Sequence, residues 1–356
     1  MLLDLVKIFI PAVLSFAIGI AATPLLSRYL YRRQMWKKRA GKRDLAGAET
    51  PLFNRLHETR EVGVPRLGGV IIWFSAAATA LLIYACAHLL GFPLFAKLDF
   101  ISRGQTWIPL VALLFGAFIG LIDDLAEVNG TREGAGGGLS LRKRLALVGL
   151  IGFVTGLWFY LKLDVSTVGI PFYGPLVIGA FIPVLYALVT LGVYSGGIID
   201  GLDGLAGGVF AIIFGAYGII AFFQSQLNLA AFCAALLGGI LSFLWFNIPP
   251  ARFYMSETGS MALTLALSVV AFLTDALGEG EGLFVLPIIA LPLVVTSASA
   301  LAQLLSKRFF RRKLFQIAPL HHHFEAIGWP SHKVVMRYWV ISIIAALIGL
   351  IVALAG

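Results

Sequence analysis

Ten long runs of apolar residues constrain the fold of this chain more than any other feature of its sequence. A helix needs about 20 apolar residues to cross the hydrocarbon core of a bilayer. The runs cover residues 3–27, 68–91, 106–126, 143–162, 174–197, 205–223, 228–247, 258–277, 283–305 and 335–355. Because a chain in lipid must satisfy its own backbone hydrogen bonds, these runs predict an all-α polytopic membrane protein with ten transmembrane helices. Prolines at positions 183, 287 and 292 predict kinks.

The composition agrees with a membrane protein. Of the 356 residues, 59% are hydrophobic and 13% are charged, whereas a soluble domain averages about 25% charged residues. The net charge of +9 raises the alternative of a nucleic-acid partner, but lysine and arginine retained in cytoplasmic loops explain it better. We expect no nucleic acid as a partner. With no internal repeat and no soluble domain, residues 1–356 are predicted to form a single integral membrane domain.

The distribution of lysine and arginine predicts the orientation. If both termini face outward, the inner connections are 28–67, 127–142, 198–204, 248–257 and 306–334. These connections and the adjoining helix ends carry 23 of the 27 lysines and arginines, as the positive-inside rule requires. The 11 basic residues between Arg28 and Arg66 are expected to attract anionic lipid headgroups as well. The outer loop at 163–173 contains turn-forming residues and predicts a small hairpin between the fourth and fifth helices.

Acidic residues gather at the ends of helices on the predicted inner side. Asp123 and Asp124 end the third helix, and adjacent carboxylates repel unless a cation compensates them. Mg²⁺, which prefers oxygen ligands, is the expected partner. The alternative is a pair of solvated acids, but the negative end of the helix dipole disfavours them there.

Two further inner connections carry polar groups with glycines or aromatic residues. Asp200 and Asp203 flank a glycine-rich turn that suits phosphate, although Asp203 can also cap the next helix. Residues 246–260 combine aromatic rings, an amide, an arginine and Glu257, which suits a nucleobase. Glu257 can instead simply compensate a helix dipole, and the residues alone leave these two interpretations about equal.

Three consecutive histidines, His321, His322 and His323, lie in the last inner connection. Consecutive side chains point in different directions, so one such run makes a poor three-histidine zinc site. Phosphate binding or proton transfer is the better prediction.

With these motifs, the chain resembles the bacterial phospho-N-acetylmuramoyl-pentapeptide transferases, within the polyprenyl-phosphate N-acetylhexosamine 1-phosphate transferase superfamily. The resemblance covers about residues 20–350. It rests on Pro65-Arg66-Leu67-Gly68-Gly69, Asp123-Asp124, the Asp-Gly-Leu-Asp-Gly-Leu-Ala stretch from Asp200, Leu244-Trp245-Phe246-Asn247 and the segment 318–325 around the histidines. The triple histidine is the most specific of these motifs.

The resemblance implies an activity and roles for individual residues. The implied enzyme transfers phospho-MurNAc-pentapeptide from its UDP-linked precursor to undecaprenyl phosphate, giving lipid I and UMP, with Mg²⁺ and as a homodimer. It implies the bacterial inner membrane as the location and a cytoplasmic active site. The implied catalytic residues are Asp123, Asp124, Asp203, His321, His322 and His323; the substrate-binding residues are Asp200, Gly201, Leu202, Asn247, Tyr254, Arg144 and Arg66; and the metal ligands are Glu257 and Asp124.

The chain departs from the family pattern at several of these motifs. The usual Met-Gly-Asp reads Met255-Ser256-Glu257, which lengthens the acid by one methylene. The usual asparagine three residues before Asp200 is Gly197, and an expected lysine falls on Arg144. Residues 64–69 are Val-Pro-Arg-Leu-Gly-Gly, where the family usually has Thr-Pro-Thr-Met-Gly-Gly. Val62 stands where the family has a lysine just upstream of this motif. These changes predict a divergent branch with adjusted nucleotide contacts.

Two alternative functions remain at this point. A related transferase of GlcNAc-1-phosphate fits the acids, and the triple histidine argues against it. A lipid transporter is disfavoured because transporters carry their charges near the midplane of the membrane, within repeats.

Overall fold

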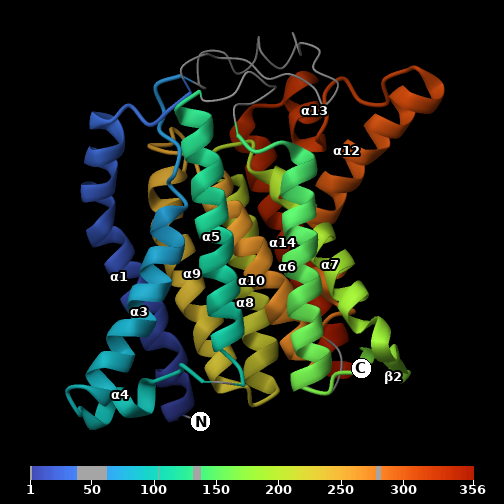
Figure 1. Cartoon of the computed structure of the whole chain (residues 1–356). Helices are drawn as coiled ribbons and strands as arrows, with labels where there is room; N and C mark the ends of the chain where they lie inside the picture. The colour runs from blue at the N-terminus through green and yellow to red at the C-terminus, as the bar shows by residue number, and fades with distance from the viewer. Residues whose placement is uncertain (1, 38–61, 103, 131–137, 278–281) are drawn as a thin grey trace.

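Long apolar helices make up most of the structure, a computed structural model that describes residues 2–37, 62–102, 104–130, 138–277 and 282–356 (Figure 1). Within these residues, nine helical segments are long and apolar enough to cross a membrane. They are formed by α1 (Leu2–Arg32), α3 (Val70–His88), α5 (Trp107–Val128), α6 (Leu141–Lys162), α7 (Ile182–Gly196) with the 3-10 turns that flank it, α8 (Leu205–Phe223), α9 (Leu227–Asn247), α10 (Ser256–Ala276) and α14 (Ser331–Ala355). The chain is a multi-pass, all-α membrane protein, as the apolar runs predicted.

The ninth predicted span, 283–305, is not one continuous helix. It comprises the short helix α11 (Leu286–Ile289) and the longer helix α12 (Leu291–Phe310), which are separated at Ala290. Pro287 and Pro292 each lie in the first turn of one of these helices, where the missing N–H of proline is tolerated. The kink expected at these prolines is therefore a break, and the total of ten spanning helices stays a prediction.

The fifth predicted span begins later than its apolar run. The hairpin expected before it is confirmed, because β1 (Thr167–Ile170) pairs antiparallel with β2 (Gly174–Val177). Residues 174–177 thus belong to a strand instead of a helix, and a 3-10 turn η1 (Gly179–Phe181) leads into α7. Pro183 lies in the first turn of α7 instead of kinking its middle.

Helix α10 forms the centre of the bundle, and nearly all of its residues are buried. It packs against α5, α7 and α8. Gly116 and Gly120 of α5 allow the closest approach: a Cβ at Gly120 would lie 2.2 Å from the carbonyl oxygen of Glu257, and one at Gly116 would lie 2.6 Å from that of Met261. Small residues let membrane helices pack backbone to backbone. This packing brings the end of α5 beside the start of α10.

The predicted connections sort to the two ends of the bundle. Both termini, the hairpin and the short helix α4 (Pro93–Leu98) lie at one end, and α13 (Leu320–Ala326) lies at the other (Figure 1). Hydrogen bonds link the predicted inner connections to one another: Tyr254 bonds to Pro65 at 2.9 Å and Ala251 to Asp203 at 3.2 Å. Much of the basic run from Arg28 to Arg66, residues 38–61, lies outside the described residues.

Candidate active site

Asp124 holds the first turn of α10. Its side chain is fully buried near the C-terminal end of α5. Its carboxylate oxygens accept hydrogen bonds from the backbone N–H groups of Glu257, at 3.1 Å, and Thr258, at 2.8 Å. Because the first N–H groups of a helix have no partner within that helix, Asp124 satisfies two of them and places negative charge at the positive end of the dipole.

Asp200 supplies another acceptor for the same turn. Its Oδ2 accepts a hydrogen bond of 2.8 Å from the backbone N–H of Ser256. Ser256 has a φ of 58°, in the left-handed region that favours glycine. The departure from the family pattern at this position thus puts a side chain where the backbone favours none. The 3-10 turn η2 (Gly197–Ile199) leads directly into Asp200.

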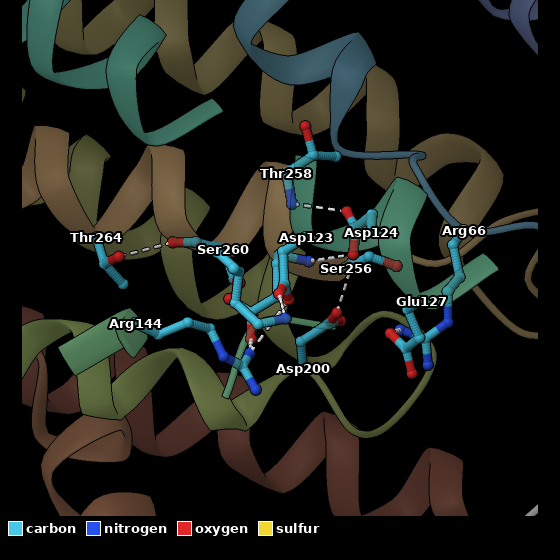
Figure 2. Close-up of polar contacts among 12 residues, drawn as sticks. Arg66, Asp123, Asp124, Glu127, Arg144, Asp200, Ser256, Thr258, Ser260 and Thr264 are labelled. Atoms are coloured by element: carbon cyan, nitrogen blue, oxygen red, sulfur yellow. Dashed lines mark hydrogen bonds and ion pairs between the residues drawn. The ribbon is translucent and has the colours of Figure 1, made fainter. Parts of the chain in front are cut away.

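Arg144 joins two further acids. Its Nη1 lies 2.5 Å from Oε1 of Glu257 and 3.4 Å from Oδ2 of Asp123. Asp123 is buried and also accepts a hydrogen bond from the backbone N–H of Leu139. Figure 2 shows Asp123, Asp124, Asp200 and Arg144 around the start of α10. The first turn of α6, the end of α5 and the start of α10 therefore meet through one cation and two carboxylates.

Arg66, predicted to bind substrate, lies to one side of this group (Figure 2). Its guanidinium pairs with Glu127, which also lies 3.4 Å from Nζ of Lys37. Glu127 is absent from the sequence-based predictions. It follows Asp123 and Asp124 by one helical turn, and this spacing, which puts residues on one face of a helix, was the signal that could have identified it.

The loop between η2 and α8 is tied to the segment before α10. The amide of Asn247 accepts a hydrogen bond of 2.9 Å from the N–H of Gly204 and donates one of 2.9 Å to the carbonyl of Phe253. Oδ2 of Asp203 accepts a hydrogen bond of 3.2 Å from the N–H of Ala251. Asn247 and Asp203 therefore position two loops, whatever substrate contacts they also make.

Two other predicted substrate residues differ in exposure. Leu202 is buried in the apolar core, with 7% of its surface exposed. Tyr254 is half-buried, and its backbone bonds to the segment that carries Arg66: its carbonyl accepts a hydrogen bond of 2.8 Å from the N–H of Gly68. Tyr254 thus lies beside that segment, while the side chain of Leu202 contributes mainly to packing.

The expectation that the three consecutive histidines point in different directions holds for His323 and is wrong for His321 and His322, whose rings lie 4.3 Å apart and approach the same glycine. His321 and His322 are buried on α13, and a Cβ at Gly201 would lie 2.5 Å and 2.7 Å from their Nε2 atoms. His322 Nδ1 also lies 3.0 Å from Oε2 of Glu325. His323 instead accepts a hydrogen bond of 3.3 Å from the N–H of Gln316. Only glycine at position 201 allows two imidazoles to approach the loop that carries Asp200.

The acids have the chemistry of a site for a hard cation. Among the residues that the structure describes, no group of three or more histidine, cysteine, aspartate or glutamate side chains is arranged to hold a metal ion. Asp123 and Glu257 nevertheless converge on a single guanidinium nitrogen. Two carboxylates that share one cation in this way have the oxygen donors that Mg²⁺ and Ca²⁺ prefer.

Comparison with known protein families indicates the class of protein to which this chain belongs. The model of glycosyl transferase family 4 matches residues 106–275, which run from the start of α5 nearly to the end of α10. Together with the helices that are long and apolar enough to cross a membrane, this match indicates a glycosyl transferase embedded in a membrane.

Individual relatives narrow the class to one family. The phospho-N-acetylmuramoyl-pentapeptide-transferase of Chloroflexus aggregans is 32% identical over 311 residues, which cover 83% of this chain and 78% of that protein. The protein of the same name from Listeria monocytogenes serotype 4b is 33% identical over 306 residues, with coverages of 84% and 87%. The chain belongs to the phospho-N-acetylmuramoyl-pentapeptide-transferase family, a family of transferases in peptidoglycan biosynthesis, and the resemblance seen in the motifs is confirmed.

Proposed function

We propose that the chain transfers phospho-MurNAc-pentapeptide from UDP-MurNAc-pentapeptide to undecaprenyl phosphate, giving lipid I and UMP. The observation that carries the proposal is the joining of Asp123, Glu257 and Arg144 at one end of a membrane bundle, beside buried histidines. A cation bound between acids suits a pyrophosphate substrate, and a site at the end of the bundle is open to a soluble nucleotide and to a lipid headgroup.

The reaction exchanges one phosphoanhydride bond for another. An oxygen of the lipid phosphate attacks the phosphorus that carries MurNAc. The bond from this phosphorus to the oxygen of UMP breaks, and its electron pair leaves with UMP. Because the lipid phosphate is largely ionised near neutral pH, direct attack needs no strong base, and a two-step route through an aspartate is the alternative. The protein then contributes mainly positioning and charge stabilisation.

Asp123 and Glu257 are the residues that we expect to hold Mg²⁺, and Asp124 stays a predicted ligand because a carboxylate that accepts two hydrogen bonds still has lone pairs. The cation, when bound, neutralises charge on the pyrophosphate and on departing UMP. Arg144 would then be released from the two carboxylates and turn toward the substrate phosphates. His321 and His322 would hydrogen-bond to the same phosphates from the side of the 200–204 loop.

The location follows from the charge distribution. We propose that the site faces the cytoplasm across the bacterial inner membrane, because the described basic residues at the end of α1, the start of α6 and the end of α12 lie at the same end of the bundle as α13. Both termini would then face outward, and membrane lipids would surround the bundle. We also propose a homodimer, which the family resemblance implies.

The test is release of UMP by the purified full-length protein, given both substrates and Mg²⁺. We expect release, its loss on chelation with EDTA, and recovery when Mg²⁺ is restored. Absence of release with every divalent metal tried would contradict the proposal. Full activity of a Glu257→Ala variant would show that Glu257 is not a metal ligand, and the proposed reaction would still stand.

The nearest alternative keeps the enzyme and changes the sugar. The replacement of the usual asparagine by Gly197 supports this alternative, because Gly197 has no side-chain amide that could hydrogen-bond to a nucleotide sugar. Parallel assays with UDP-GlcNAc and UDP-MurNAc-pentapeptide distinguish the two functions. Transport of labelled lipid in vesicles without UMP release would instead favour the transporter.

A further inference from the structure

The C-terminal end of α12 leaves the bundle and exposes every residue of a basic segment. Figure 1 shows this end, in orange, leaning away from the other helices. Residues 307–314, which we term the basic turn, are all exposed. Five of these eight residues are lysine or arginine, and the sequence from 282 to 324 contains no aspartate or glutamate. The basic turn therefore concentrates positive charge in a stretch of sequence that contains no acid.

Large apolar side chains are interleaved with these cations. Phe309 and Phe310 are 69% and 71% exposed, and Leu314 is 57% exposed. The guanidinium of Arg308 lies 5.9 Å from the centre of the Phe309 ring. Exposed rings among arginines disfavour a purely aqueous surrounding and are typical of segments that lie at the boundary between lipid headgroups and acyl chains.

Buried polar side chains of α12 hold the basic turn in shape. Oε1 of Gln303 accepts hydrogen bonds of 2.9 Å from the N–H groups of Leu314 and Phe315, and its Nε2 donates one of 2.9 Å to the Phe315 carbonyl. The hydroxyl of Ser306 donates one of 3.0 Å to the carbonyl of Arg312. The chain reverses at Arg311, which has a φ of 52°. The basic and apolar side chains are thus presented outward by a preformed turn.

We propose that the basic turn is a binding surface for the phosphate headgroups of anionic bilayer lipids, of the phosphatidylglycerol class. Arginine matches phosphate geometry with paired N–H donors, and a basic residue beside a membrane surface adds to binding of anionic lipid. Phe309, Phe310 and Leu314 contact the upper acyl chains. A soluble anion or a nucleic acid would satisfy the charges and leave these apolar side chains in water. The surface does not depend on the proposed transfer reaction.

The test measures which lipids stay bound to the full-length protein after transfer from bilayers of equal phosphatidylglycerol and phosphatidylcholine, counted by native mass spectrometry. The test variant is Arg311→Gln/Arg312→Gln/Lys313→Gln. The control is Lys97→Gln/Lys162→Gln, which removes exposed cations outside the predicted inner connections. We expect an excess of phosphatidylglycerol on the wild type, a loss of at least about fivefold in the test variant, and retention in the control.

Several outcomes would overturn the proposal. They are equal binding of the two lipids to the wild type, equal losses in the test and control variants, and retention of undecaprenyl phosphate in place of phosphatidylglycerol by the basic turn. If the glutamine variant does not fold, Arg311→Lys/Arg312→Lys keeps the charge and is expected to retain the excess. The excess of phosphatidylglycerol is also expected to fall as the salt concentration is raised, because salt screens exposed charges. An excess that does not depend on salt would contradict the proposal.

Discussion

Two pairs of acids at the start of α10 differ in what they bind. Asp124 and Asp200 accept hydrogen bonds from backbone N–H groups of α10. Among the described residues, Asp123 and Glu257 accept no such bond from α10 and instead meet the side chain of Arg144, although Asp123 also accepts a hydrogen bond from the N–H of Leu139, outside α10. A backbone N–H cannot leave without unfolding the turn, whereas a guanidinium on a long side chain can move away and be replaced by another cation. The first pair therefore builds the site, and the second pair is available for chemistry.

Replacing Asp124 by alanine is expected to have the largest effect on stability. It leaves the buried N–H groups of Glu257 and Thr258 without acceptors, at a cost of roughly 1–3 kcal/mol for each group. We expect a clearly lower free energy of unfolding, measured by denaturant titration in detergent micelles, and a loss of activity with it. Asp123→Ala in the same titration is the control. Equal destabilisation by the two variants would remove the distinction between the pairs.

Replacing Asp123 by asparagine is expected to act on the reaction instead. The amide preserves the shape and removes the charge that Arg144 and the proposed cation share. We expect UMP release to fall roughly 100- to 1,000-fold, the range for removal of one stabilising group in an active site. The melting temperature should stay near that of the wild type, and Mn²⁺ binding, followed by electron paramagnetic resonance, should weaken. Unchanged Mn²⁺ binding would place the metal elsewhere.

Replacing Gly201 by alanine tests whether His321 and His322 act in the reaction, as we expect of Asp123 and Glu257. The new Cβ would lie 2.5 Å from Nε2 of His321, so the imidazoles must move. A displacement of about 1 Å can cost on the order of 100-fold in rate, and we expect UMP release to fall roughly 10- to 100-fold. Gly215→Ala is the control, because no atom lies within 4 Å of its Cβ position. Full activity of Gly201→Ala would exclude His321 and His322 from substrate positioning.

Replacing Ser256 by glycine is expected to have the smallest effect, and of opposite sign. Relief of the left-handed backbone at Ser256 should raise the free energy of unfolding by roughly 0.5–1 kcal/mol. The titration used for Asp124→Ala measures it. Ser260→Gly, within the same helix, is the control and should destabilise the protein. A loss of stability in Ser256→Gly would mean that the serine side chain stabilises this turn.

Much of the fold could be predicted because hydropathy is a local property of the chain. The apolar runs predicted the membrane-spanning helices, and the turn residues near 163–173 predicted the hairpin that β1 and β2 form. The start of the fifth span was wrong because apolar residues 174–177 suit a strand as well as a helix, and only pairing with β1 decides between them.

The candidate site was predicted as a set of residue types at one end of the bundle, and the placement of Asp123, Asp124, Asp200, Glu257 and Arg144 around the start of α10 agrees with it (Figure 2). Their individual partners were not predictable. Asp124 and Thr258 are 134 residues apart, and neighbours in sequence say nothing about such a contact.

The sequence by itself determined that this chain is a membrane protein, that connections rich in lysine and arginine alternate with connections poor in them, and that acids and histidines occur in the basic connections. These features can be read locally, because each helix that crosses lipid must be apolar whatever the other helices are. Only the tertiary structure decided that Asp124 binds a helix end while its neighbour Asp123 faces Arg144. Adjacent residues on a helix point about 100° apart, so the packing of α5 against α10 gives two identical side chains different partners.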